Sequence, residues 1–83
     1  MEVSLHPKAA KYLRDLNEPI KSRIIDALKK LEEEPPQGDI KSMGGSADCY
    51  RLRVGSYRIL FKVDVKAVRV QNIGLRGQIY KRK

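Results

Sequence analysis

The sequence has only one cysteine, Cys49, in 83 residues. An intramolecular disulfide is therefore excluded, and with it the class of small secreted proteins that are held together by several disulfides. Apolar runs are also short. None reaches the roughly 18 residues of a membrane-spanning helix, and the first ten residues, MEVSLHPKAA, contain no apolar stretch of signal-peptide length. We expect a protein of the reducing cytoplasm that has no membrane partner.

The sequence is equally poor in metal ligands. It has one histidine, His6, and its acidic residues are scattered, so no group has the spacing of a metal site. Because His6 lies far from Cys49 along the chain, thiol catalysis by a cysteine-histidine pair is not expected either. We predict a protein that uses neither a metal ion nor any other cofactor.

Negative charge is scarce in the second half of the chain. The whole sequence has 18 lysines and arginines against 10 acidic residues, which gives a formal net charge of +8. From Ile40 onward, only Asp48 and Asp64 are acidic. Such an excess of positive charge is typical of proteins whose partner is rich in phosphate or carboxylate.

The length of the chain predicts one domain over residues 1–83. A domain of this size buries only about 60% of the surface that its unfolded chain exposes. The core is therefore expected to be small, and a functional site should be a shallow groove rather than a closed pocket.

A short strand followed by a helix is predicted at the start of the chain. Val3 and Leu5 alternate with polar residues, and Pro7 stands where the first turn of a helix tolerates proline. Apolar residues then recur at helical spacing as far as Leu16. Asn17 is expected to end this helix and to cap the next one.

A second, longer helix is predicted from Pro19 to Glu34. Its apolar residues form one stripe of a helix, at Ile20, Ile24, Ala27, Leu28 and Leu31. Pro35 and Pro36 should stop it, because a residue before proline is disfavoured in the helical conformation. The two helices should together form a hairpin.

Beyond the helices, the pattern changes to that of strands. Residues 37–47 are rich in glycine, serine and aspartate and are expected to be a loop. Three runs follow in which apolar and polar residues alternate: 50–54, 57–63 and 67–73. Gly55 and Ser56 have the pattern of a two-residue hairpin turn with glycine first, and Gly74 should close the last strand before a basic tail.

This order of elements predicts an α+β fold. It consists of an N-terminal strand and a helical hairpin packed on one face of a mainly antiparallel, four-stranded sheet. The opposite face of the sheet is expected to stay open to solvent.

The predicted turn determines which hairpin residues face each other. The pairs expected on the helix-covered face are Val54 with Tyr57, Leu52 with Ile59, and Tyr50 with Phe61. Arg53 then lies opposite Arg58 on the open face, with Arg51 two positions along, and opposed like charges cost about 0.2–1 kcal/mol. Such a cluster favours an anion, because guanidinium groups hold phosphate oxygens with two hydrogen bonds. The alternative is a solvated face, since exposed arginines are common.

The second half of the chain also carries a family resemblance. Its motifs, in order, are Asp48-Cys49-Tyr50-Arg51-Leu52-Arg53, Tyr57-Arg58-Ile59-Leu60-Phe61, Ile73-Gly74-Leu75-Arg76 and Tyr80. Together with the helical hairpin before them, they resemble the RelE branch of the RelE/ParE toxin family over nearly the whole chain. The order of these motifs along the chain is more specific to the family than any single motif is.

The resemblance implies a toxin of a toxin-antitoxin system that cleaves messenger RNA on the ribosome. It also implies a cognate antitoxin protein that holds the toxin inactive, so the expected partners are the antitoxin, the ribosome and its message. Carried over by motif, the catalytic residues are Arg51, Arg53, Arg58, Arg76 and Tyr80. Further residues expected to bind RNA are Lys62, Arg69, Lys81 and Arg82.

These residue types fit RNA cleavage that leaves a cyclic phosphate. That reaction needs the 2′-hydroxyl deprotonated, the charge on the pentacoordinate phosphate stabilised, and the departing 5′-oxygen protonated. Arginine suits only the second task, because its pKa lies above about 12. Tyr80 is the candidate base, provided that nearby guanidinium charge lowers its pKa, although its ring could instead pack on the sheet edge.

The chain departs from the family pattern at three positions. Leu75 stands where some relatives have histidine or lysine, and Arg51 and Arg53 stand where lysines are frequent. The proton donor is therefore unassigned, and the candidates are Lys62, Lys81 and a group of the ribosome or its RNA.

Two other functions fit the same residues. A ParE-like inhibitor of DNA gyrase shares the fold and the arginine-rich hairpin, but it does not need Arg76 and Tyr80. A module that binds RNA or an antitoxin without cutting is suggested by the absent lysine and histidine.

Overall fold

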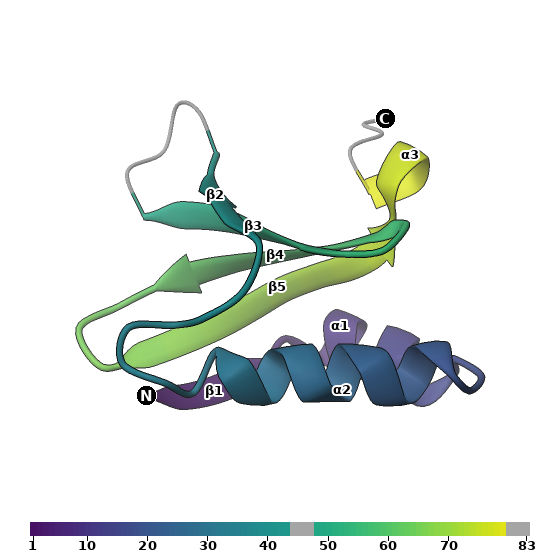
Figure 1. Ribbon diagram of the computed structural model, residues 1–83, viewed down its shortest axis with the longest axis horizontal. Coiled ribbons are helices and arrows are strands. Elements are labelled where there is room, and N and C mark those ends of the chain that lie inside the picture. Colours follow the sequence, from purple (N-terminus) through teal and green to yellow (C-terminus); the bar gives the residue numbers. More distant parts are fainter. Residues whose placement is uncertain (44–47, 80–83) are drawn as a thin grey trace.

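The computed structural model, which describes residues 1–43 and 48–79, has a five-stranded sheet with two helices on one of its faces (Figure 1). In chain order the elements are β1 (Glu2–Leu5), α1 (Pro7–Arg14), α2 (Ile20–Lys30), β2 (Ile40–Ser42), β3 (Cys49–Val54), β4 (Tyr57–Val63), β5 (Ala67–Leu75) and α3 (Arg76–Ile79). The strand order is β1-β5-β4-β3-β2. Only β1 and β5 pair in parallel. The predicted α+β class, with a helical hairpin on a mainly antiparallel sheet, is confirmed.

The two long helices start and end near the predicted positions, with one different cap. Pro7 occupies the first turn of α1, as expected. The N-cap residue of α2 is Pro19 rather than the predicted Asn17. The Oε1 atom of Glu18, one residue before the N-cap, accepts a hydrogen bond of 3.1 Å from the Ser22 N–H in the first turn. Hydrogen bonding from Ser22 also lowers the pKa of the Glu18 carboxyl.

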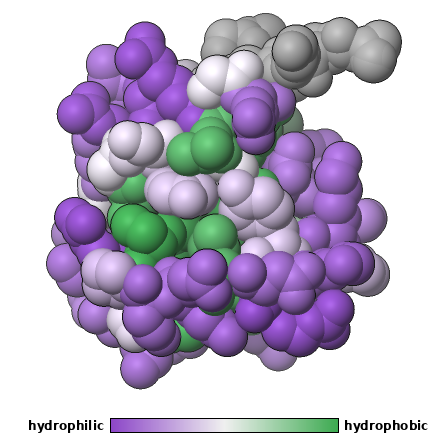
Figure 2. All heavy atoms as spheres, turned by 90° about the vertical axis from the view of Figure 1, so that its right-hand side faces the viewer, coloured by the Kyte–Doolittle hydropathy of each residue, from purple (hydrophilic) through white to green (hydrophobic). Residues whose placement is uncertain are grey.

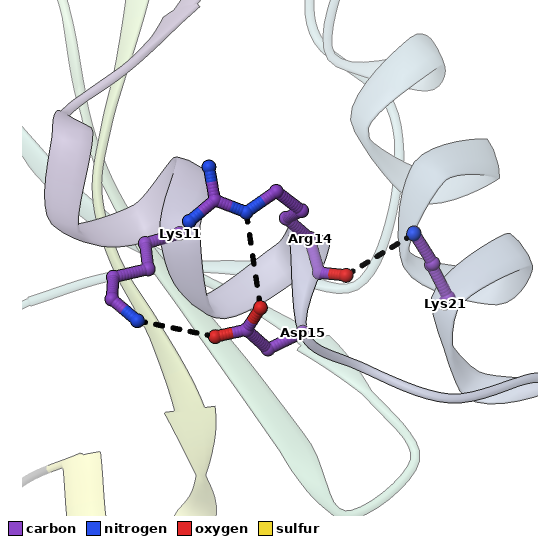
Figure 3. A network of polar contacts seen from close by, with 4 residues as sticks. All are labelled: Lys11, Arg14, Asp15 and Lys21. Carbon is purple, nitrogen blue, oxygen red and sulfur yellow. Dashed lines mark hydrogen bonds and ion pairs between the residues drawn. The ribbon is translucent and has the colours of Figure 1, made fainter.

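A small polar network joins the end of α1 to α2 (Figure 3). The Asp15 carboxylate lies 3.3 Å from Lys11 Nζ and 3.8 Å from Arg14 Nε. Lys21 Nζ donates a hydrogen bond of 3.2 Å to the carbonyl oxygen of Arg14. Each exposed ion pair contributes only about 0–1 kcal/mol, so the network orients the hairpin more than it stabilises the protein.

The second helix is shorter than predicted, because it ends at Lys30 instead of Glu34. The N–H groups of Leu31, Glu32 and Glu33 each bond to the carbonyl three residues earlier, at 3.1–3.3 Å. This tighter turn ends the α-helix while keeping Leu31 fully buried. Among the described residues, no helix is long and apolar enough to cross a membrane.

The sheet has one strand more than predicted. Residues 37–47 were expected to be a loop, but Ile40, Lys41 and Ser42 form β2 and pair with Leu52, Arg51 and Tyr50 of β3. A three-residue strand leaves almost no alternation in the sequence, and it is formed by pairing with a distant segment rather than by local propensity. At the other end, β5 extends to Leu75 rather than Ile73, and the expected basic tail begins with the short helix α3.

The hydrophobic core lies between the helices and the sheet. Its buried residues come from the helical stripes and from alternate sheet positions: Ala9, Ile24, Leu28, Leu31, Leu52, Ile59, Phe61, Val68, Val70 and Ile73. Seen from the end that carries the hairpin turn, apolar residues are exposed between the helical layer and the sheet, and hydrophilic residues surround them (Figure 2). The core is thus thin, as expected for a chain of this size.

The contrast between a buried and an exposed valine tests this core. Val70 is fully buried, whereas Val65 is 86% exposed. We expect Val70→Ala to lower the free energy of unfolding by about 2 kcal/mol, because two buried carbon groups and their contacts are lost. Val65→Ala is the matched control and should change it by less than about 0.5 kcal/mol. Urea unfolding measures both, and equal effects would contradict this description of the core.

Candidate functional site

The hairpin of β3 and β4 has the predicted turn and register. Gly55 has a φ of +59° and Ser56 does not have a positive φ, which is the glycine-first turn expected from the sequence. The pairs Val54 with Tyr57, Leu52 with Ile59, and Tyr50 with Phe61 are all confirmed. Because side chains alternate between the faces of a sheet, the residues between these positions point to the face without helices.

Basic residues form three adjacent rows on this open face. Arg53 lies opposite Arg58. In the next row, Arg51 lies between Lys41 of β2 and Leu60 of β4. In the third row, Lys62 pairs with Cys49 on one side and with Arg69 on the other. The register therefore places positive charge from four strands on one surface.

Four arginines line one groove at the turn end of this face, with a volume of about 520 Å³. The groove is lined by Arg51, Arg53, Gly55, Ser56, Arg58, Leu75, Arg76 and Gly77. Four of the five residues predicted to be catalytic are thus together, although they come from β3, β4 and α3. The fifth, Tyr80, lies outside the described residues, as do Lys81 and Arg82.

The short helix α3 positions Arg76 beside the turn (Figure 1). The Arg76 N–H donates a hydrogen bond of 2.9 Å to the carbonyl oxygen of Ser56. The side chain of Ile79 packs over Gly74, where an added Cβ would lie 3.4 Å from the Ile79 Cβ. An added Cβ at residue 74 would therefore make only ordinary van der Waals contact, and the packing of α3 on the end of β5 does not require glycine there.

Arg58 is buried, whereas an exposed arginine was expected there. Its residue surface is only 6% exposed. Its Nη1 atom donates to the carbonyl oxygens of Tyr57, at 3.2 Å, and Gly55, at 3.4 Å. No acidic residue in the described part of the chain forms an ion pair with it, and its buried Nε has no hydrogen-bond partner there. Arg58 lies between Arg53 of β3 and Gly74 of β5, and these two hydrogen bonds fold its guanidinium back onto the turn.

The other two hairpin arginines differ in their surroundings. The Nε atom of Arg51 is buried and finds no hydrogen-bond partner within residues 1–43 and 48–79. Arg53 is more exposed, and its Nε lies 3.7 Å from the Asp39 carboxylate. The Arg53 N–H also donates to the Asp39 carbonyl oxygen at 3.0 Å. Asp39 is therefore an internal competitor for any anion that approaches Arg53.

Lys62 and Arg69, predicted to bind RNA, are neighbours on the open face but do not line the groove. Lys62 follows Arg58 by four residues on β4, a distance of about 13 Å along a strand. Arg69 donates a hydrogen bond of 3.2 Å to the Asp64 carboxylate. They form a second positive area, separate from the arginine groove.

Two residues of this surface were missed by the sequence analysis. Lys41 lies directly opposite Arg51, and Asp39 pairs with Arg53. Both belong to the segment that was expected to be a loop. The only signal for them was the alternation of Ile40, Lys41 and Ser42, which is too short to distinguish from chance.

The chemistry available in the groove is that of fixed cations. Guanidinium groups donate hydrogen bonds and stabilise negative charge, but they do not exchange protons near neutral pH. Among the described residues, no group of three or more histidine, cysteine or acidic residues could hold a metal ion. The groove is therefore suited to a phosphate group with several oxygens, which guanidinium groups hold with paired hydrogen bonds.

Comparisons with known proteins agree with this geometry. Residues 3–80 match the sequence model of a family described as ParE toxin of type II toxin-antitoxin system, parDE. A curated protein of Methanocaldococcus jannaschii, named as a RelE1 toxin, is 29% identical over 84 residues, covering 95% of this chain and 93% of that protein. The family match spans all five strands of the sheet apart from Glu2, the first residue of β1.

Solved structures show the same fold. The archaeal RelE-RelB complex from Pyrococcus horikoshii contains a chain that is 27% identical, with a TM-score of 0.77 and coverage of 93% of this chain and 96% of that one. The RelB-RelE antitoxin-toxin complex from Methanococcus jannaschii gives a TM-score of 0.80 at 24% identity, covering 95% and 96% of the two chains. At that identity, the second likeness shows the fold alone.

Replacing the buried arginine tests whether it serves binding rather than folding. We expect Arg58→Met to leave the free energy of unfolding unchanged or to raise it, because an uncompensated buried charge is replaced by an apolar chain of similar length. Inorganic phosphate should raise the thermal midpoint of the wild-type protein but not that of the variant. Arg14→Met, which removes an exposed arginine on α1 away from the open face, is the matched control and should be stabilised by phosphate like the wild type. Equal stabilisation of Arg58→Met and the wild type by phosphate would contradict the assignment.

Proposed function

The chain belongs to the RelE/ParE family of type II toxin-antitoxin toxins, and from this premise we propose that it cleaves messenger RNA on the ribosome without a metal ion. The observation that carries the proposal is the groove in which Arg51, Arg53, Arg58 and Arg76 converge. A site for a phosphodiester needs several positive donors around one point. The four guanidinium groups of this groove supply them, and the buried Arg58 lies where water screens charge weakly.

In the proposed reaction, the 2′-oxygen of one ribose attacks the adjacent phosphorus while the bond to the 5′-oxygen breaks. The products are a 2′,3′-cyclic phosphate and a 5′-hydroxyl. Negative charge grows on the non-bridging oxygens in the transition state, and Arg51, Arg58 and Arg76 are placed to donate hydrogen bonds to them. Because the donors are fixed before the reaction starts, they stabilise the transition state without rearranging.

Tyr80 is the proposed base that accepts the proton of the 2′-hydroxyl. A tyrosine pKa is ordinarily about 10, and a phenolate forms near neutral pH only where neighbouring cations favour it. The four arginines of the groove provide that positive charge. Tyr80 follows α3 by one residue in the sequence, and α3 contributes Arg76 to the groove.

Protonation of the departing 5′-oxygen needs a different group. Lys62 is poorly placed for it, because it lies about 13 Å along β4 from Arg58 and does not line the groove. We therefore assign Lys62, with Arg69, Lys81 and Arg82, to RNA binding. Lys81 or a group of the ribosome remains as the proton donor, which makes cleavage by the isolated protein slow. An activity of this kind belongs in the cytoplasm, where ribosomes translate.

An antitoxin protein is the second proposed partner. The related chains from Pyrococcus horikoshii and Methanococcus jannaschii were solved as complexes of RelE with RelB. The basic open face of this chain would attract an acidic or amphipathic segment of such a protein. Covering the groove would then inactivate the toxin by excluding the message.

A ParE-like effect on DNA gyrase is the second candidate function. It is favoured by the description of the matched family, which names ParE. Gyrase inhibition would not need Arg76 or Tyr80. A supercoiling assay with purified gyrase separates the two functions, because inhibition of supercoiling by a chain that leaves messages uncut on ribosomes favours ParE-like action.

The nuclease proposal predicts the effect of two substitutions on message cleavage. Arg76→Ala and Tyr80→Phe should each slow cleavage of a ribosome-bound message by about 100-fold or more, since one loses a transition-state donor and the other a base. A toeprint assay on translating ribosomes measures the cut. Arg14→Ala, an exposed arginine on α1, is the control and should cut at the wild-type rate. Unchanged cleavage in both site variants would rule out the mechanism.

The arginine groove also predicts how RNA binding depends on salt. If four phosphate contacts are made, the logarithm of the affinity for single-stranded RNA should fall with the logarithm of salt concentration with a slope of about −3. Arg53→Ala should make the slope shallower by about 0.7, because one contact is lost. Fluorescence anisotropy across a salt series measures both slopes. A slope near zero would mean that the groove does not bind phosphates.

A further inference from the structure

A small apolar recess lies on the open face, next to the arginine groove. It has a volume of about 190 Å³. Its lining is almost wholly apolar and consists of Met43, Cys49, Tyr50, Leu60, Phe61, Lys62 and Gln71. A site of this size suits one flat ring, since an engineered cavity of about 150 Å³ holds benzene.

The recess borders the groove at one cross-strand pair. Leu60, which lines the recess, lies directly opposite Arg51, which lines the groove. Leu60 also follows Arg58 by two residues on β4, a distance of about 7 Å along a strand. That spacing is close to the length of one nucleotide, so a chain whose phosphate lies at Arg58 would bring an adjacent base over Leu60.

A β-bulge places an amide at the edge of the recess. Phe61 pairs with Val70 and Leu60 with Asn72, which leaves Gln71 as an extra residue on β5. Bulges are common beside functional sites, where they redirect a side chain. Gln71 is exposed and lines the recess. Its amide has both a donor and an acceptor, the combination that recognises the edge of a nucleobase.

Positive charge on both sides of the recess limits what can occupy it. Arg51 and Arg58 lie toward the turn, and the Lys62 and Arg69 pair lies at the other side. A ligand that spans all three areas needs negative charge at both ends, over the basic residues. Between them it needs a flat apolar group that lies over the recess. A single strand of RNA has this alternation of phosphates and unpaired bases.

We propose that this recess binds one unpaired nucleobase of the RNA whose phosphate lies in the arginine groove. Leu60 contacts the face of the base and Gln71 bonds to its edge, while Lys62 holds a neighbouring phosphate. This inference rests on the proposed RNA-cleaving function and adds a residue-level account of base selection. It makes Leu60 and Gln71 specificity residues rather than catalytic ones.

The test uses binding of uncleavable RNA to the full chain. The probes are 2′-O-methyl tetranucleotides, which cannot be cut by 2′-hydroxyl attack. One probe carries all four bases, and each of four others lacks one base. For the wild type, removal of the base at one position should weaken binding about tenfold, the scale of one base stacked on a protein side chain. Removal of the base at any of the other three positions should weaken binding less.

Two variants connect that loss to the recess. Leu60→Asn and Gln71→Ala should each bind the complete probe about three- to tenfold more weakly, and the critical base should no longer matter to Leu60→Asn. Gln37→Ala, which changes a glutamine lining a different cavity, is the control and should bind like the wild type. Gln71 is exposed, so its variant keeps the fold even if Leu60→Asn lowers the thermal midpoint.

The outcomes separate this inference from the proposed function. If the complete and base-free probes bind the wild type equally, the recess is not a base site, while the groove still binds phosphates. The same conclusion follows if base removal costs as much in Leu60→Asn and Gln71→Ala as in the wild type. If no probe binds at all, the inference is overturned, whereas the proposed cleavage is decided separately by the toeprint assay on translating ribosomes.

Discussion

The register of β3 against β4 is the constraint on which the rest of this surface depends. Gly55 and Ser56 form a turn of only two residues, so the pairing of Arg53 with Arg58 leaves no freedom to slip. Side chains alternate along a strand, and a shift of one residue would exchange the two faces of the hairpin. Leu52 and Ile59 would then face solvent and the arginines would face the core. Burial of the apolar residues is thus what holds the cations together on the other side.

The same constraint forces like charges to stay close. Arg58 is buried without an acidic partner in the described part of the chain, and it lies opposite a second arginine. An uncompensated buried charge destabilises a protein, and this small core has little stability to spare. A residue that lowers stability in the free protein and would be satisfied by an anion indicates a site shaped for binding. The Asp39 carboxylate relieves only Arg53, the more exposed member of the pair.

The sequence predicted those parts of the structure that depend on residues close together in the chain. It did not predict the parts that depend on contacts between distant segments. The hairpin register could be predicted because Gly55-Ser56 and the alternating apolar residues act within a few positions. Lys41 could not be placed, because β2 exists only through its pairing with β3. The surroundings of Arg58 could not be predicted either, because Gly74, 16 positions away, becomes its neighbour only in the folded sheet. Convergence of Arg76 with the hairpin likewise depends on a hydrogen bond to Ser56.

The composition of the groove suggests a reason for dependence on a larger partner. Arginines stabilise growing negative charge well, but their pKa prevents them from moving protons at neutral pH. In the proposed reaction, this chain therefore supplies most of the electrostatic stabilisation and only one candidate base. A 2′-hydroxyl must also be held in line with the departing 5′-oxygen, and orientation of this kind is worth several kcal/mol. In the proposed reaction, a shallow groove on an 83-residue protein would hold a flexible RNA only loosely, whereas a message already stretched across a ribosomal site would arrive oriented. The proposed dependence on a ribosome is thus consistent with what fixed cations on an open sheet cannot do alone.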